Sequence, residues 1–421
     1  MRFFKKKVIS VLIIIILIFS NSITSIAAFW EEPESFEDTG GAVAVIKNES
    51  QSTSIFNLQS KSVLLGDASS GQVLFEKNCH EKLAPASVTK IMPLLLYMEA
   101  IDSGRIKLQD KVSCSEYAAS MGGSQIWLEP GEQMTVDEML KCICVVSAND
   151  CTVALGEHIY GSEEGLLKAM NDKAKALGMK DTYFSDATGL ADENHYTSAY
   201  DIFLMSRELV NNHPLVHKYT TIWMDTVRNG EFGLSNTNKL VRFYKGCDGI
   251  KTGSTSKALF CVSESAKRNG LNLIAVIMAA PTSKDRFSEA TKLLDHGFAN
   301  YSAVKVGKKG DIYGVLKVQK GIKTNLDCVA GEDMSALVKK GSEGSVEKII
   351  SLETKIVAPV KKGQKVGEIV FKSKDKKLGK FDLVARESVD KATFIRIYAE
   401  MFKNWGTIGR QDLAKNIKFR I

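Results

Sequence analysis

Three short motifs, in a fixed order along the chain, carry the residue types that an acyl-transfer site needs. Residues 87–90 read Ser-Val-Thr-Lys, residues 147–149 read Ser-Ala-Asn, and residues 251–253 read Lys-Thr-Gly. No single motif is specific, because Ser-x-x-Lys also occurs elsewhere in this chain, for example at residues 302–305, 345–348 and 373–376. A serine hydroxyl needs a base within hydrogen-bond reach to become a good nucleophile. Together and in this order, the motifs predict a nucleophile, a base and an anion-binding strand.

The first motif predicts the nucleophile and its base. Pro85 marks a helix start, and apolar residues spaced through 91–98 continue the helix. Residues three apart share a helix face, so Lys90 is expected one turn from Ser87. Lysine is a base only when burial or a second cation lowers its pKa, and Lys251 is the candidate cation. N–H groups at the helix N-terminus suit an oxyanion. The alternative, for one motif alone, is a solvated helix face.

The second motif follows residues 139–146, an apolar run that reads as a buried helix. At its polar end, Ser147 could carry a proton between the nucleophile and the leaving group, and Asn149 could bind a substrate amide. The alternative is an ordinary turn at the C-terminus of a helix.

The third motif lies in residues 248–255, which have strand character, and residues 259–263 read as the next strand of a hairpin. Gly253 lets another backbone approach closely. Lys251 and Thr252 could hold a carboxylate. A surface turn is the alternative for this motif by itself.

The order of the three motifs resembles that of penicillin-binding proteins and serine β-lactamases. Residues 59–298 further resemble the low-molecular-weight penicillin-binding proteins, the D-alanyl-D-alanine carboxypeptidases. Beyond the motifs, the likeness is carried by residues 83–87 before the nucleophile, 184–190 between the second and third motifs, and 236–240 before the third.

This resemblance implies roles for four residues at the reacting centre. Ser87 would be acylated, Lys90 would be its base, and Ser147 and Asn149 would assist. The chain departs from the family pattern at Cys151, where many relatives have alanine. It also departs at residues 185–187, where an asparagine-proline type of sequence is more usual. These departures concern fine specificity rather than the reaction class.

The resemblance also implies the substrate-binding residues. Lys251 and Thr252 of the Lys-Thr-Gly motif, which Gly253 completes, would hold the substrate's terminal carboxylate. The N–H groups of Ser87 and Ser254 would form an oxyanion hole, and Arg286 resembles an arginine near the same carboxylate.

The expected function is therefore that of a serine-type D-alanyl-D-alanine carboxypeptidase acting on peptidoglycan stem pentapeptides. β-Lactam antibiotics would be covalent inhibitors, and no metal or organic cofactor is implied. A β-lactamase or esterase on the same scaffold is one alternative. Class A β-lactamases use a dedicated glutamate, and Glu193 lies in the right general region, but residues 193–196 do not match that family's loop. A non-catalytic cell-wall scaffold is the other alternative, and the complete motif set argues against it.

The first 57 residues predict an exported protein. Residues 1–28 have the basic start, apolar core and small cleavage-site residues of a signal peptide, with an uncleaved anchor as the alternative. Residues 29–57 read as an acidic linker. We expect the protein at the outer face of the cytoplasmic membrane or in the cell wall, and the Ile- and Lys-rich composition favours a Gram-positive source.

The next segment, 58–301, is expected to be the catalytic domain, with an α/β (α+β) fold of the penicillin-binding/β-lactamase-like transpeptidase type. Strands at both of its sequence ends and helices between them predict a sheet flanked by helices, with a helical insertion. The expected strands are 62–68, 72–76, 248–255, 259–263 and 272–278, helices dominate 87–209, and a closing helix is expected at 286–298.

Beyond residue 301 the composition changes. Residues 302–388 have short β-rich pieces, such as 312–318, 349–357 and 365–371, and predict a small antiparallel all-β sandwich domain resembling the carboxypeptidases' C-terminal domain. Residues 301–421 hold 26 Lys+Arg against 14 Asp+Glu, so the basic character of this chain of net charge +7 lies here. Few aromatics are interleaved with the lysines, which favours an anionic envelope or membrane surface over nucleic acid.

Residues 389–421 predict an amphipathic, membrane-associating tail. Its apolar residues share one helical face, with an alternative in which this helix packs on the sandwich. These residues are Phe394, Ile395, Tyr398, Met401, Phe402 and Trp405.

Cysteine and histidine usage predicts neither a disulfide framework nor a metal site. Four of the eight cysteines lie in apolar surroundings and read as small core residues: Cys142, Cys144, Cys151 and Cys261. His213 and His217 have metal-like spacing, but a proline lies between them and no acidic third ligand is evident.

Overall fold

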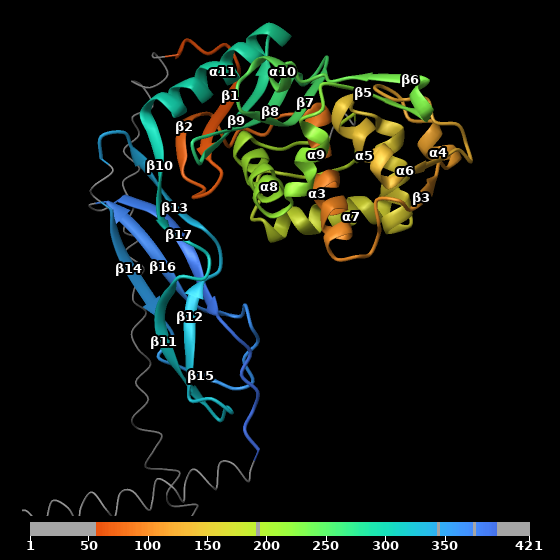
Figure 1. Cartoon of the computed structure of the whole chain (residues 1–421). Coiled ribbons are helices and arrows are strands. Elements are labelled where there is room, and N and C mark those ends of the chain that lie inside the picture. The colour runs from red at the N-terminus through yellow and green to blue at the C-terminus, as the bar shows by residue number, and fades with distance from the viewer. Residues whose placement is uncertain (1–55, 191–193, 343–345, 374–375, 394–421) are drawn as a thin grey trace, which may run out of the picture. The chain divides into compact units, whose positions relative to one another are not determined.

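Figure 1 shows the computed structural model of the chain, which describes residues 56–190, 194–342, 346–373 and 376–393. The expected signal peptide, almost all of the expected acidic linker and most of the expected tail, including its apolar face, lie outside the described residues. None of the helices within the described ranges is long and apolar enough to span a membrane.

A five-stranded antiparallel sheet organises the first part of the described chain. Its strands run in the order β2-β1-β9-β8-β7, so strands from both sequence ends of this part lie side by side. The strand predictions are confirmed to within a few residues. The strands are β1 (Ser62–Asp67), β2 (Val73–Lys77), β7 (Cys247–Thr255), β8 (Leu259–Arg268) and β9 (Leu271–Ala280).

Both faces of this sheet are covered, and strand β9 shows why. All ten of its residues are buried. Alternate side chains of a strand point to opposite faces. One set, such as Ile277, joins the apolar cluster of helix α11 (Ser283–Asn300), while the other, such as Val276, joins that of helices α3 (Ile91–Asp102) and α8 (Ala199–Asn212). The apolar sequence of β9, continuous over residues 273–280, is therefore what a central strand between two layers requires.

The helical insertion lies between β2 and β7 in sequence. Several of its helices begin at a side chain that caps the first turn. Thr135 forms a reciprocal capping box with Glu138 at the start of α5, Ser162 caps α7, and Ser198 caps α8. Such caps are each worth about 1 kcal/mol. Its remaining elements are α4 (Glu116–Ala119), α5 (Val136–Val145), α6 (Asn149–Tyr160), α7 (Glu163–Ala176), α9 (His217–Thr220), α10 (Leu240–Phe243), β3 (Lys111–Ser113), β4 (Gln133–Thr135), β5 (Met224–Val227) and β6 (Phe232–Ser235).

The second part is all β, as predicted. A six-stranded sheet has the order β14-β16-β17-β12-β11-β15, and a separate ribbon pairs β10 with β13. The ribbon packs apolar side chains such as Val338 against Phe371 and Leu383 of the sheet. The strands are β10 (Tyr301–Gly307), β11 (Ile312–Gln319), β12 (Asn325–Ala330), β13 (Met334–Lys339), β14 (Glu347–Leu352), β15 (Lys355–Val357), β16 (Lys365–Ser373) and β17 (Lys376–Ala385).

Two details of the all-β part differ from the prediction. The expected strand 349–357 is two strands, β14 and β15, which lie at opposite edges of the six-stranded sheet. The sheet is also not wholly antiparallel, because β15 pairs with β11 in parallel. The chain passes from β14 to β15 through residues 353–354 alone, without a glycine or proline to mark the change of strand in the sequence.

Candidate active site

Ser87 and Lys90 lie on one short turn at the start of helix α3. The turn, Ala86–Lys90 (η1), is a 3-10 helix rather than the α-helix that the spacing predicted. In a 3-10 helix, residues three apart lie directly above one another, so the two side chains point to the same side of the turn. Lys90 Nζ lies 3.0 Å from Ser87 Oγ, and Ser87 is half-buried. The expected proximity of Ser87 and Lys90 is therefore observed, and their roles as nucleophile and base stay a prediction.

The surroundings of Lys90 favour its neutral form. Burial lowers the pKa of Lys90 well below its ordinary value, the Lys251 charge lowers it further, and Asp186 and Asp150 oppose the shift. Lys251 therefore lies where its charge acts on Lys90, as expected of a second cation. Apart from Ser87 Oγ, Nζ contacts the Thr188 carbonyl oxygen at 2.9 Å. A neutral amine satisfies both contacts, because it can donate an N–H to Thr188 and offer its lone pair to the serine hydroxyl.

Strand β7 carries the third motif along the sheet edge, against the first. Lys251 is almost fully buried, and its Nζ donates to the Thr252 carbonyl oxygen at 2.8 Å. Burial lowers the pKa of Lys251 to about 7; the Cys144 thiol opposes this change and the Arg286 charge adds to it. Thr252 Oγ1 lies 2.7 Å from Thr237 Oγ1, so the threonine hydroxyl is held in place. A cation and a hydroxyl on neighbouring residues suit an anionic group.

Gly253 provides the predicted close approach of two backbones. A Cβ at this position would lie 2.8 Å from the Ser87 nitrogen and 2.8 Å from the Pro85 carbonyl oxygen. Only glycine allows strand β7 to lie this close to the turn that carries the nucleophile. Ser254 follows at an exposed position, beside the half-buried Ser87. Two backbone N–H groups as the oxyanion hole, those of Ser87 and Ser254, stay a prediction.

The second motif forms the junction between helices α5 and α6. Ser147 adopts a left-handed backbone conformation with φ of 66°, and its buried Oγ has no hydrogen-bond partner among the described residues. Asn149 Nδ2 donates to the Gly122 carbonyl oxygen at 2.6 Å, which leaves Oδ1 buried without a partner in the same part of the chain. A strained backbone that presents unsatisfied polar atoms is typical of functional sites.

Arg286 ties the far side of the third motif to helix α11. Its Nη1 donates to the Gly253 carbonyl oxygen at 3.1 Å and to the Cys261 carbonyl oxygen at 3.2 Å, and the residue is buried. The structure therefore places Arg286 at the third motif, as the resemblance implied. Direct contact with a substrate carboxylate stays a prediction.

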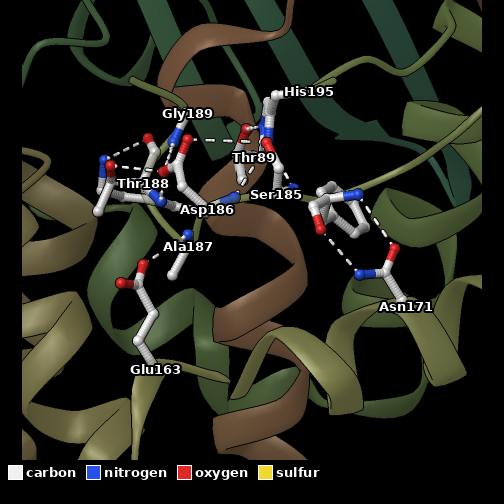
Figure 2. Close-up of polar contacts among 11 residues, drawn as sticks. Thr89, Glu163, Asn171, Ser185, Asp186, Ala187, Thr188, Gly189 and His195 are labelled. Carbon is white, nitrogen blue, oxygen red and sulfur yellow. Dashed lines mark hydrogen bonds and ion pairs between the residues drawn. The ribbon is translucent and has the colours of Figure 1, made fainter. Parts of the chain in front are cut away.

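The loop at residues 184–190 positions Lys90, a role that the motifs did not reveal. The Thr188 carbonyl oxygen accepts from Lys90, and the Asp186 carboxylate holds the backbone around it (Figure 2). His195 Nε2 lies 2.7 Å from Thr89 Oγ1, next to Lys90 on the same turn. The resemblance had singled out this loop, but a backbone carbonyl has no residue-type signal. The contact of Thr237 with the Thr252 hydroxyl was also missed, because the two residues are not neighbours in the sequence and only the fold brings them together.

The other candidate residues lie elsewhere. His213 and His217 do not converge: His213 Nδ1 lies 2.6 Å from Asp102 Oδ2, and His217 Nδ1 lies 3.8 Å from Asp248 Oδ2. The eight cysteines are free; the four predicted core cysteines are buried, as expected. Glu193, weighed as a β-lactamase-type residue, lies outside the described residues.

Within the described ranges, a single group could supply three metal ligands, formed by Glu99, Glu208 and His213, whose ligand atoms lie within 4.8 Å of one another. The Lys173 ammonium already lies 2.6 Å from Glu99 and 3.4 Å from Glu208. The two carboxylates therefore have a cation between them without a metal.

Both parts of the chain match known families and proteins. Residues 47–282 match the family described as D-alanyl-D-alanine carboxypeptidase, and residues 301–391 match that of the C-terminal domain of penicillin-binding protein 5. D-alanyl-D-alanine carboxypeptidase DacF of Bacillus subtilis is 44% identical over 366 residues, which cover 86% of this chain and 94% of DacF. DacC of Escherichia coli is 32% identical over 349 residues, covering 80% and 86%.

Solved structures agree with these matches. Penicillin-binding protein 5 from Haemophilus influenzae is similar with a TM-score of 0.66 and 30% identity, over 79% of this chain and 98% of that one. Penicillin-binding protein D2 from Listeria monocytogenes, in its ampicillin-bound form, gives a TM-score of 0.51 and 30% identity over 57% of this chain and 98% of that one. The match over more than half of the sequence, together with the paired serine and lysine, shows that this chain belongs to the D-alanyl-D-alanine carboxypeptidase family.

Proposed function

We propose that this protein removes the terminal D-alanine from peptidoglycan stem pentapeptides through an acyl-enzyme on Ser87. One observation carries the proposal: Lys90 Nζ, buried and with a lowered pKa, lies 3.0 Å from Ser87 Oγ. A base of lowered pKa beside a hydroxyl is the arrangement that nucleophilic catalysis requires. Family membership supplies the substrate class.

Acylation begins when Ser87 Oγ attacks the carbonyl carbon between the two terminal D-alanines. Lys90 takes the hydroxyl proton as the Oγ–C bond forms. As the C–N bond breaks, the proton passes through Ser147 to the nitrogen of the leaving D-alanine. The buried Ser147 hydroxyl, with no partner among the described residues, is free to receive and pass on that proton.

Deacylation reverses these roles with water as the nucleophile. Lys90, neutral again, takes a proton from the attacking water and returns it to Ser87 Oγ as the ester bond breaks. The products are the shortened stem peptide and the free enzyme, so the proton balance closes without a further reactant.

Substrate binding draws on the remaining site residues. Lys251 and Thr252 hold the terminal carboxylate of the substrate. Arg286 fixes the next residue of the strand by donating to the Gly253 carbonyl oxygen. Asn149 offers its unpaired Oδ1 to a substrate amide. The N–H groups of Ser87 and Ser254 stabilise the oxyanion, because donors held in a low-dielectric site interact strongly with the negative charge as it develops. A β-lactam presents a carboxylate and a strained amide in a similar arrangement, so it acylates the same serine.

Intact mass and D-alanine release test this proposal together. The purified protein is exposed to benzylpenicillin and, separately, to a diacetylated Lys-D-Ala-D-Ala peptide. We expect a lasting adduct of one penicillin and release of D-alanine, both lost in Ser87→Ala. Ser302→Ala is the matched control, because Ser302 begins another Ser-x-x-Lys sequence at residues 302–305, in strand β10. An adduct that turns over within seconds would indicate a β-lactamase instead, and no adduct with no D-alanine would indicate a scaffold protein.

The location of the enzyme belongs to the same proposal. The basic and apolar start of the chain supports export, and the substrate lies outside the cytoplasmic membrane. The apolar face expected in residues 394–405 supports attachment to a membrane surface.

A further inference from the structure

The loop at residues 184–190 is built around one carboxylate. Asp186 Oδ1 accepts three hydrogen bonds, from Thr188 N at 2.5 Å, Thr188 Oγ1 at 2.7 Å and Gly189 N at 2.7 Å. The two backbone donors are consecutive, so both peptide units are oriented toward Asp186. Figure 2 shows these contacts gathered in front of the turn that carries Thr89.

This arrangement aims the Thr188 carbonyl at the base. The C=O of Thr188 and the N–H of Gly189 belong to one planar trans peptide unit and point in opposite directions. Because Asp186 holds that N–H on one side, the carbonyl oxygen must point to the other, where Lys90 Nζ lies at 2.9 Å.

Close packing leaves the loop little room to adjust. Gly189 has φ of 87°, and a Cβ there would lie 1.9 Å from the Ala86 carbonyl oxygen and 2.8 Å from Thr89 Oγ1. The loop therefore rests directly on the turn that carries Ser87 and Lys90. A shift of Asp186 would be transmitted to the Lys90 amine rather than absorbed.

The other side of the loop is clamped by a neutral histidine. His195 Nδ1 accepts from Ser185 N at 3.2 Å and Asp186 N at 3.4 Å, so the ring proton lies on Nε2, which donates to Thr89 Oγ1. Burial lowers the pKa of His195, in agreement with this neutral tautomer. Asp186 Oδ2 lies 3.7 Å from Nδ1, so the carboxylate sits between His195 and Lys90.

Helix α7 holds the remaining backbone of the loop (Figure 2). Asn171 bonds both polar groups of the Phe184 backbone, at 3.0 and 2.8 Å, and Glu163 Oε1 accepts from Ala187 N at 3.2 Å. These contacts fix the path of the loop independently of Asp186. Loss of the Asp186 side chain should therefore alter the Thr188 peptide before it alters the whole loop.

We propose that Asp186 is a positioning residue for Lys90, acting through the Thr188 carbonyl and placing a negative charge beside the buried amine. This inference rests on the proposed function, in which Lys90 is the base. The charged groups facing Lys90 are Lys251 from β7, Asp150 from α6 and Asp186 from the loop. Asp186 itself faces Lys90 and His195. The Asp186 charge raises the pKa of Lys90, and the Lys251 charge lowers it. Without the Asp186 charge, Lys90 should therefore lose its proton at lower pH.

Two substitutions separate the hydrogen bonds from the charge. Asp186→Asn keeps an oxygen acceptor for the three donors and removes the charge, whereas Asp186→Ala removes both. Asp172→Asn is the control, an exposed carboxylate on α7 paired only with Lys168 on the same helix. The rate of Ser87 acylation by benzylpenicillin is measured from pH 5 to pH 10, with thermal unfolding followed for each variant.

We expect Asp186→Asn to move the acid limb of the rate profile to lower pH, with a plateau within about threefold of wild type. Asp186→Ala should lower the plateau at least tenfold, about 1.4 kcal/mol of activation free energy. A wild-type pH profile for Asp186→Asn would refute the proposed effect of the Asp186 charge on Lys90. A wild-type acylation rate for folded Asp186→Ala would refute the proposed positioning of Lys90. If Asp186→Ala does not fold, the pH profile of acylation by Asp186→Asn decides whether the proposal stands. Absence of any adduct in the wild-type protein would instead refute the proposed function.

Discussion

Gly253 lies against the Ser87 backbone, so strand β7 and the turn that carries Ser87 are in direct main-chain contact. The nearest atoms to a Cβ at Gly253 would be three backbone atoms, each 2.8 Å away. Backbone atoms at the start of a helix cannot move aside as the end of a flexible side chain can.

Gly253→Ala should therefore separate β7 from the turn and slow acylation by benzylpenicillin at least tenfold. Gly233→Ala is the control, because a Cβ on Gly233 in strand β6 meets no atom within 4 Å. Acylation rates and melting temperatures are compared for both variants. A wild-type acylation rate in Gly253→Ala would show that the contact is not needed for the site.

Acylation should depend on pH through Lys90. Burial and Lys251 hold the pKa of Lys90 well below its ordinary value, so the neutral base is available at lower pH than for an ordinary lysine, and the rate should fall as acid protonates it. The acylation rate from pH 5 to pH 10 should therefore level off well below the ordinary lysine pKa of about 10.4. In Lys251→Gln the acid limb should move to higher pH, since a charge that lowers the pKa of Lys90 is gone. A rate that still rises tenfold per pH unit at pH 10 would contradict a lysine base of lowered pKa.

Glu264 should make the protein less stable as pH rises. Its side chain is fully buried on β8, Oε2 accepts from Asn238 Nδ2 at 2.8 Å, and burial raises the pKa of Glu264 to about 8. The folded state keeps a proton that the unfolded chain has lost, so the free energy of unfolding falls between about pH 4.5 and pH 8, by at most ~1.4 kcal/mol per pH unit.

Glu264→Gln removes this titration and keeps an acceptor for Asn238. Urea unfolding at pH 5 to pH 9 should show the variant gaining stability over wild type as pH rises, while Glu347→Gln, at an exposed position of β14, should follow wild type. Parallel pH dependence in Glu264→Gln and wild type would show that Glu264 does not titrate in this range.

The tail should attach the protein to anionic membranes. Full-length protein is expected to sediment with phosphatidylglycerol vesicles, and protein cut after Lys391 should stay in the supernatant. A finer test places the same charge on either side of the expected helix: Trp405→Glu should release the protein, whereas Asn404→Glu, off the apolar face, should not. Sedimentation of the truncated protein would place the membrane contact elsewhere.

What the sequence predicted of the site depended on side-chain chemistry. Ser87, Lys90 and Lys251 could be grouped from their types and order, and the burial of β9 agrees with the apolar run at residues 273–280. The Thr188 carbonyl could not be found in this way, since every residue has a carbonyl and only the fold decides where it points. The 3-10 geometry of the first motif was equally hidden, because its residues also suit an α-helix.

The all-β part shows a different limit. Residues 349–357 have the composition of one strand, and nothing at Glu353 signals a turn. Which edge of a sheet a short strand joins is decided by partners distant in sequence, such as Lys317, which pairs with Lys355. Pairing in parallel needs such a distant partner, and local composition does not specify it.

The order of strands in the central sheet has a consequence for the order in which the chain can fold during synthesis. Strand β1 is made first, yet one of its two neighbours, β9, ends at residue 280, after the whole helical insertion. Until that residue is made, β1 lacks its neighbour β9, and strand β7 is not yet joined to β1 through β8 and β9. A nascent chain of this enzyme therefore stays incomplete, and inactive, for more than two hundred residues after its first strand appears.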